Sequence, residues 1–425
     1  MIALTIGSFF AFTLLGVPIA FALGLAALAG ISFSGGDLVQ LAGKVLNSID
    51  SFPLMAIPLF VLSGELMIRG KAMGPLIDFA NAIVGRMRGG LALVAVQSTM
   101  VMSAISGVAV ADATAIGGTL GRPLEKAYGK TFSASLVATA SCMGPIIPPS
   151  APMILYAILV GDVSVAGMFL GGVVPGLMIG IMLMVYSVWV ARRRGYPPTG
   201  DAFSILNLLR SFRIALPFLA MPVVVIGGII IGAFTATEGA AIAVLCALML
   251  GFLVTRQLTV RDLLTALGHA ASVSAIVGAL IAFSSSITHI FTLERVGEVV
   301  AEAILHATNS PMVMMALVCV IILILGMFIE GNSMLIMTAP ILAPVAVSMG
   351  IDPVYFGVVF VFAAVMGTLT PPVGILLFVV SSIWKVDIRA LIKETFPMFM
   401  ILLFILALIV IFPDLILALP RYVMS

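Results

Sequence analysis

The motif Gly-x-x-x-Pro-Pro occurs twice in this 425-residue chain, at Gly144–Pro149 and at Gly367–Pro372. The two copies lie 223 residues apart (367 − 144), and each interrupts a long apolar run. Proline removes a backbone donor and clashes with the preceding helical turn, so each copy breaks its helix. Within a bilayer, a broken helix is tolerated only where protein or a wet cavity covers the freed polar groups. The motifs therefore predict two discontinuous helices at matching positions, a pattern typical of a solute site.

The composition places the chain among integral membrane proteins. Hydrophobic residues make up 62% of it and charged residues 9%, whereas soluble domains carry roughly 25% charged residues. At ~20 residues per pass, this length allows about nine to twelve membrane passes. The net charge of +2, without a basic helix that carries interleaved aromatic residues, argues against a nucleic-acid partner. The apolar N-terminus, continued from Phe9 to Ala29 without a cleavage site, predicts a retained span rather than a signal peptide.

Long apolar runs define the expected spans. We predict them near residues 2–33, 52–68, 131–160, 164–191, 214–234, 238–255, 272–292, 354–383 and 396–413. Two further apolar segments, 91–120 and 313–345, contain small and polar residues midway. Each is interpreted as a re-entrant hairpin because it precedes one of the broken helices, 131–160 and 354–383; a pair of full spans is the alternative. Amphipathic segments are expected on the membrane surface or as loops, at 35–50, 69–90 and 294–306.

Basic residues divide the chain and orient it. The arginine-rich stretch 191–213 is interpreted as a cytoplasmic linker, because cytoplasmic loops carry an excess of Lys and Arg. It separates a first repeat, 1–190, from a second repeat, 214–425. Basic residues flank the first hairpin but not the second, so the two hairpins are expected to open to opposite faces. The predicted fold is an all-α integral membrane protein of two inverted repeats, each with a re-entrant hairpin and a discontinuous helix.

Oxygen-bearing groups gather at both predicted sites. In the first half, the Ser103 and Ser106 hydroxyls of the hairpin tip would meet carbonyls freed near Gly144. In the second half, Gly326, the following tip and the Thr370 hydroxyl would form a second oxygen-rich nest. Such oxygens suit sodium, and the positive N-termini of half-helices at the same breaks attract anions. The alternative is that the hydroxyls bond within their own helices and the prolines merely kink them.

Ionisable residues within apolar runs are costly and usually functional. Asp112 follows the first tip by five residues, and both helix capping and a role near the solute or ion are open for it. Glu330 begins the second tip and is assigned to the cavity, whereas Glu238 is expected to cap a helix after Thr235. The predicted solute-binding set is Asp112, Ser150, Glu330, Asn332 and Ser333.

Signals of catalysis are missing from the sequence. Gly129-Lys130-Thr131 is similar to the end of a phosphate-binding loop, but Leu124 stands where that motif needs glycine. No nucleophile–base pair and no His/Asp metal cluster stands out. We therefore expect a chain that is not an enzyme and that uses no cofactor.

At this point the residues resemble a known family, the large membrane subunit of tripartite ATP-independent periplasmic (TRAP) transporters. The matching segments are Met143–Ser150, Ser106–Asp112, Thr368–Gly374, Gly16–Leu23 and Phe234–Ala240, and the resemblance covers nearly the whole chain. It implies a sodium-coupled importer with an elevator mechanism in the bacterial inner membrane. The implied solutes are organic acids such as C4-dicarboxylates, keto acids and sialic acids.

The resemblance also implies partners and sodium ligands. The partners would be a small four-helix membrane subunit and a soluble periplasmic solute-binding protein. A self-sufficient sodium–carboxylate symporter of related fold is the alternative. Val108 and Val110 stand where the family frequently has smaller or polar residues, which leaves the solute open. By position, the sodium sites fall at Ser103, Ser106, Gly144, Ile147 and Pro148, and at Gly326, Gly367, Thr370 and Val373.

Overall fold

The structure, a computed structural model, describes residues 1–34, 37–161, 163–196, 198, 204–295, 308, 310–327, 329–371 and 374–424. This part of the chain contains no β-strand and only an isolated bridge between Arg88 and Pro198, so the all-helical class is confirmed. Seven of its helical stretches are long and apolar enough to cross a membrane. They are η1–α4 (Phe52–Arg69), α10 (Val165–Arg193), α11 (Ile205–Ile230), α12–η2 (Ala236–Val254), α13 (Val260–Leu293), α16 (Gly331–Ser348) and α19 (Ile388–Ile411).

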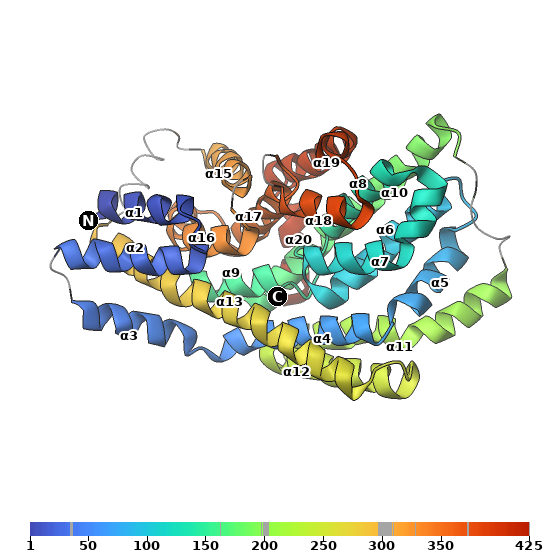
Figure 1. Ribbon diagram of the computed structural model, residues 1–425, viewed down its shortest axis with the longest axis horizontal. Helices are drawn as coiled ribbons and strands as arrows, with labels where there is room; N and C mark the ends of the chain where they lie inside the picture. The colour runs from blue at the N-terminus through green and yellow to red at the C-terminus, as the bar shows by residue number, and fades with distance from the viewer. Residues whose placement is uncertain are drawn as a thin grey trace.

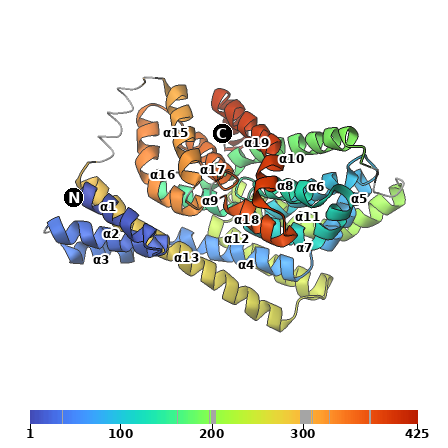
Figure 2. The ribbon, with the colours of Figure 1, turned by 45° about the horizontal axis from the view of Figure 1, so that its top comes forward.

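The helices form two groups (Figures 1 and 2). In the first group, which we call the frame, α4 packs against α12 and α13, and α13 against the N-terminal helices. The frame comprises α1 (Ile2–Leu14), α2 (Ile19–Ser34), α3 (Leu38–Ile49), α4 (Ala56–Arg69), α11–α13 and α5 (Met73–Val84), which also packs against the second group. The second group, which we call the site unit, comprises α6 (Gly90–Ser106), α7 (Ala109–Tyr128), α8 (Lys130–Ser141), α9 (Ala151–Val160), α10, α15 (Pro311–Gly326), α16, α17 (Pro353–Gly367), α18 (Ile375–Trp384), α19 and α20 (Asp414–Met424).

Both Gly-x-x-x-Pro-Pro motifs break their helices in the site unit. Helix α8 ends before the first motif and α9 begins just after it, while α17 ends at Gly367 and α18 begins at Ile375. Each break follows a pair of helices: α6 and α7 pack together and meet at Gly107, and α15 and α16 pack together and meet near Glu330. Gly107 has φ +64°, a left-handed conformation that glycine adopts without strain and that lets the chain reverse.

The prediction of one span over residues 2–33 is wrong. The apolar run forms two helices, α1 and α2, which pack side by side, so the helix does not continue from Phe9 to Ala29. The turn between them contains Gly16, with φ +84°, followed two residues later by Pro18. A left-handed glycine followed closely by proline ends a helix, and here it overrides the apolar character of the run.

The polar segments of the sequence correspond to helix ends and short helices. Helix α10 runs to Arg193 and α11 begins at Ile205, so both ends of the predicted 191–213 linker are helical. Two of the predicted amphipathic segments contain α3 and α5, whereas residues 296–307 lie outside the described residues. The predicted cap at Glu238 is confirmed, because Glu238 and Thr235 form a reciprocal capping box at the start of α12.

Helix α17 is the centre of the site unit. Every residue from Tyr355 to Gly367 is buried, and the helix contacts α9, α10, α15, α16 and α19. A helix that is apolar on all sides can be buried on all sides. At its C-terminal break Leu369 is buried, whereas Thr368, Thr370 and Pro371 are half-buried, so protein covers part of the freed backbone.

Candidate functional site

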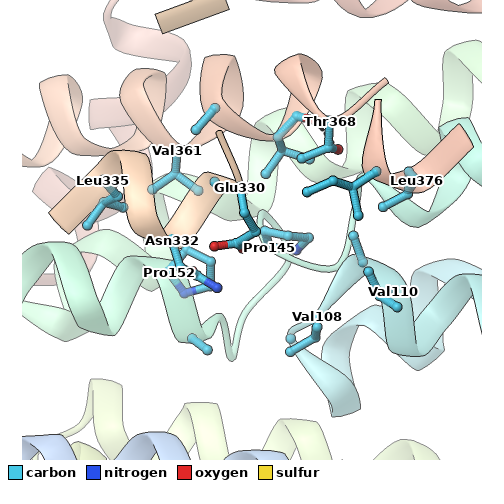
Figure 3. Close-up of a pocket in the computed structure, with 17 residues that line it drawn as sticks. Val108, Val110, Pro145, Pro152, Glu330, Asn332, Leu335, Val361, Thr368 and Leu376 are labelled. Atoms are coloured by element: carbon cyan, nitrogen blue, oxygen red, sulfur yellow. Dashed lines mark hydrogen bonds between the residues drawn. The ribbon is translucent and has the colours of Figure 1, made fainter. Parts of the chain in front are cut away.

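A cavity of about 80 Å³ lies where the two helical pairs meet the two broken helices (Figure 3). Glu330 and Pro145 lie near its centre in the view, with Leu335 and Val361 to one side and Leu376 to the other. The wall includes the first two residues of four helices: Ala109 and Val110 of α7, Ala151 and Pro152 of α9, Gly331 and Asn332 of α16, and Ile375 and Leu376 of α18. Helix N-termini carry unpaired amides and the positive end of the helix dipole, so these helix starts attract an anion, whereas the Glu330 carboxylate in the same wall repels one.

The four helix starts differ in how they are capped. Ser150 caps α9 by accepting from the Met153 amide at 3.3 Å, and Glu330 caps α16 by accepting from the Ser333 amide at 3.0 Å. By contrast, α7 and α18 begin without a side-chain cap. At the start of α18 the Leu376 amide already donates to the Thr368 carbonyl at 3.1 Å. The start of α7 is therefore the better place for a ligand carboxylate.

The predicted first nest contains a buried carboxylate. Ser103 donates a hydrogen bond to Asp112 Oδ2 at 2.6 Å, and Ser106 donates to Asp112 Oδ1. Asp112 and Ser103 are 0% exposed. Within the described ranges no basic side chain forms an ion pair with Asp112. A buried charge without a partner of opposite sign is costly, so this carboxylate has to be neutralised by a bound cation or by a proton.

Gly144 brings the first break against this carboxylate. A Cβ added at Gly144 would lie 2.7 Å from Asp112 Oδ2 and 2.9 Å from the Ala109 nitrogen. Any larger residue would push the break away from the tip of the α6–α7 pair. Ile147 directs its side chain toward Gly176 of α10, and Pro148 is buried in the same break. Ser103, Ser106, Asp112 and Gly144 thus lie together.

The second nest is built on two glycines. A Cβ added at Gly367 would lie 2.6 Å from the Gly326 Cα, so the ends of α15 and α17 touch backbone to backbone. The Thr370 hydroxyl donates to the Met366 carbonyl at 3.0 Å, within its own helix end, and its oxygen retains lone pairs for a cation. Val373 lies outside the described residues.

The predicted solute-binding residues divide into two sets. Glu330 and Asn332 line the cavity. Ser150 is fully buried and serves as the α9 cap, and its hydroxyl donates to the Pro145 carbonyl at 2.5 Å. Asp112 and Ser333 do not line the cavity either, since Asp112 lies in the first nest and Ser333 bonds to Glu330.

Sequence reasoning missed most of the cavity wall. Val361, Ala364 and Val365 project from the middle of α17, and nothing distinguishes them from other apolar residues of a buried helix. Thr368 also lines the cavity. It could have been predicted from the sequence, because it is the first polar residue of the second motif.

The fold and the paired breaks around a cavity lined by helix N-termini define a multi-pass membrane transport protein. A model of the tripartite ATP-independent periplasmic transporter, DctM component, matches residues 6–415, and the chain belongs to this family. It is therefore a large permease of the bacterial inner membrane rather than an enzyme.

Relatives with different solutes in their names match nearly the whole chain. Identity is 35% with the sialic acid TRAP transporter large permease SiaM of Vibrio cholerae, over 96% of this chain and 95% of that protein. It is 36% with the C4-dicarboxylate large permease DctM of Pseudomonas aeruginosa, over 93% and 92%. It is 37% with the isethionate permease DctMQ of Oleidesulfovibrio alaskensis, where the match covers 94% of this chain but 63% of that longer protein.

Two solved transporters share the fold at low sequence identity. The YdaH transporter of Alcanivorax borkumensis superposes with a TM-score of 0.63 at 16% identity, over 87% of this chain and 86% of that one. MtrF of Neisseria gonorrhoeae gives a TM-score of 0.62 at 14% identity, over 88% and 83%. These similarities concern the arrangement of helices.

Proposed function

We propose that this permease carries a small organic acid across the inner membrane together with sodium. The observation that carries the proposal is the buried Asp112 carboxylate beside a cavity lined by helix N-termini. Asp112 lies in the first turn of α7, and the start of that same helix lines the cavity. Sodium at Asp112 would neutralise the carboxylate, with Ser103 and Ser106 supplying hydroxyl oxygens and the neighbouring break supplying carbonyls. The second nest, between Gly326 and Thr370, is the proposed second sodium site.

The residues of the cavity wall restrict the class of solute that can bind. The wall is mostly apolar, and its polar side chains are Glu330, Asn332 and Thr368. An organic acid with a carboxylate at the start of α7 and an apolar part against Leu335 and Val361 fits this wall. Among the expected solutes, keto acids and C4-dicarboxylates, which carry fewer hydroxyl groups than a sialic acid, therefore come first.

We propose that the site unit moves against the frame as an elevator built from two inverted repeats. Contacts between the groups are compatible with sliding where small residues meet: a Cβ at Gly64 of α4 would lie 3.1 Å from the Ser106 Cα at the first tip. The tip thus lies directly against the backbone of α4 at Gly64.

The proposed partners are those of the family, a small four-helix membrane subunit and a periplasmic solute-binding protein. The binding protein would deliver the solute to the outer end of the pathway. A self-sufficient symporter is the competing function, and it differs in needing no binding protein.

The test is uptake by the purified permease, reconstituted with its small subunit, from a panel of radiolabelled organic acids. Uptake should require both an inward sodium gradient and the binding protein, and ATP should not affect it. Equal uptake from potassium and sodium media would refute sodium coupling. Strong uptake of free acid without the binding protein would instead favour the self-sufficient symporter.

A further inference from the structure

A second and larger cavity adjoins the first on the side of the frame. This groove has a volume of about 570 Å³ and lies between α4, α13 and the tip of the α6–α7 pair. Val108 and Val110 line both spaces, so the groove begins where the solute cavity ends. On the site unit, the groove wall consists of small, apolar and hydroxyl side chains, among them Thr114. On the frame, it carries Glu65, Arg69 and His269.

The three frame residues are linked through Glu65. Its Oε2 accepts from Arg69 Nε at 3.3 Å, and its Oε1 lies 3.0 Å from His269 Nδ1. Both carboxylate oxygens are thus engaged, and Glu65 holds the other two side chains at the groove. A guanidinium has five N–H donors, of which Glu65 uses the one on Nε. Among the described residues, no ion pair or hydrogen bond involves the two terminal nitrogens of Arg69.

We propose that Arg69, held by Glu65, forms a second anion site on the frame, which binds the carboxylate of the solute between the cavity and the aqueous phase. The identity of this occupant rests on the proposed function. A planar guanidinium with two free terminal nitrogens suits a carboxylate. A carboxylate that leaves the start of α7 passes Val108 and Val110. It would move from the positive end of the helix to the Arg69 guanidinium, and so would not remain in an apolar passage without a partner of opposite charge. Glu65 and the nearby carboxylate of Asp262 compete for the same guanidinium, so binding is weak enough for release.

The electrostatic claim can be tested without knowing the solute. Thr114 is exposed in the groove, and Thr114→Cys places a thiol there in a chain whose three native cysteines have been replaced by alanine. The probes are an anionic sulfonatoethyl and a cationic aminoethyl methanethiosulfonate. Their ratio of modification rates cancels any change in the thiolate fraction. Arg69→Gln should lower the anion-to-cation ratio about tenfold, because a nearby unit charge shifts the two probes in opposite directions.

Two variants control for folding and for general charge. Arg69→Lys keeps the charge and should retain most of the ratio. Arg192→Gln removes an exposed arginine at the end of α10 that does not line the groove, and should leave the ratio unchanged. If Arg69→Gln leaves the ratio within twofold of the parent, the anion site does not exist.

Transport by the reconstituted complex separates this proposal from the function it rests on. Arg69→Gln should slow sodium-driven uptake about tenfold, with the sodium concentration for half-maximal uptake unchanged. Normal uptake by Arg69→Gln would overturn the anion site while leaving sodium coupling intact. Failure of the parent complex to show sodium-driven uptake, with the probe ratio still dependent on Arg69, would overturn the proposed function and leave the anion site standing.

Discussion

Asp112→Asn is the sharpest perturbation of the proposed sodium site. The substitution keeps the shape of the side chain and removes its charge. One carboxylate oxygen becomes an amide nitrogen facing Ser103 or Ser106, and that hydroxyl can rotate to accept rather than donate. The cost to folding should therefore be about 1 kcal/mol, the scale of one rearranged hydrogen bond.

The cost to sodium binding should be larger. Two unit charges ~4 Å apart at an effective dielectric constant of ~20 attract each other by about 4 kcal/mol. Because each ~1.4 kcal/mol is tenfold in affinity, the upper bound is about a thousandfold. Replacement water and the remaining oxygens recover part of this, so we expect a weakening of at least tenfold in the sodium dependence of uptake.

Thermal unfolding of the purified permease at increasing sodium concentration gives a second measurement. A ligand that binds the native state raises the melting temperature with its concentration, and Asp112→Asn should shift that dependence to higher sodium. Asp387→Asn is the matched control, since it removes an exposed carboxylate that caps α19. An unchanged sodium dependence in an active Asp112→Asn permease would refute the assignment of the site.

Three further predictions concern the sodium ligand Ser103, the contact between Gly326 and Gly367, and the membrane topology. Ser103→Ala should raise the sodium needed for half-maximal uptake by about 5–150-fold, the equivalent of losing 1–3 kcal/mol from one ligand; no change would argue for a purely structural hydroxyl. Gly367→Ala should abolish most transport because its Cβ would lie 2.6 Å from the Gly326 Cα, whereas Gly118→Ala, with nothing within 4 Å, should transport normally; equal rates would show that the glycine contact is dispensable. In cells, an impermeant thiol reagent added outside should label Ser310→Cys and spare Lys126→Cys in a cysteine-free chain, and labelling of both would refute the inverted topology.

The breaks in the site unit could be predicted because their cause is local. Proline and glycine act on the backbone of their own segment, so the two motifs located the ends of α8, α9, α17 and α18 without knowledge of the fold. The same holds for the capping box at Thr235 and Glu238, whose partners are three residues apart.

The remaining features depend on contacts between residues far apart in the chain, which local sequence patterns do not reveal. Glu65 and His269 are 204 residues apart (269 − 65), yet their side chains meet at the groove. Gly16 and Pro18 are a local signal for the turn, but the continuous apolar run led to the prediction of a single span over residues 2–33. Asp112 was assigned to the solute, whereas the structure places it with the predicted sodium ligands, because a reversal at Gly107 folds the first turn of α7 back onto α6.

The position of Asp112 suggests how the two ligands are coupled. An acidic residue in the first turn offsets the positive end of α7 at the cavity. We propose that sodium neutralises Asp112 and so restores the attraction of this helix end for the solute carboxylate. By reciprocity, the solute would strengthen sodium binding by the same factor. Asp112→Asn should then bind solute without sodium, and calorimetric titration with a transported acid, with sodium or choline present, measures this. Solute binding by Asp112→Asn that still rises with sodium would refute coupling through this carboxylate.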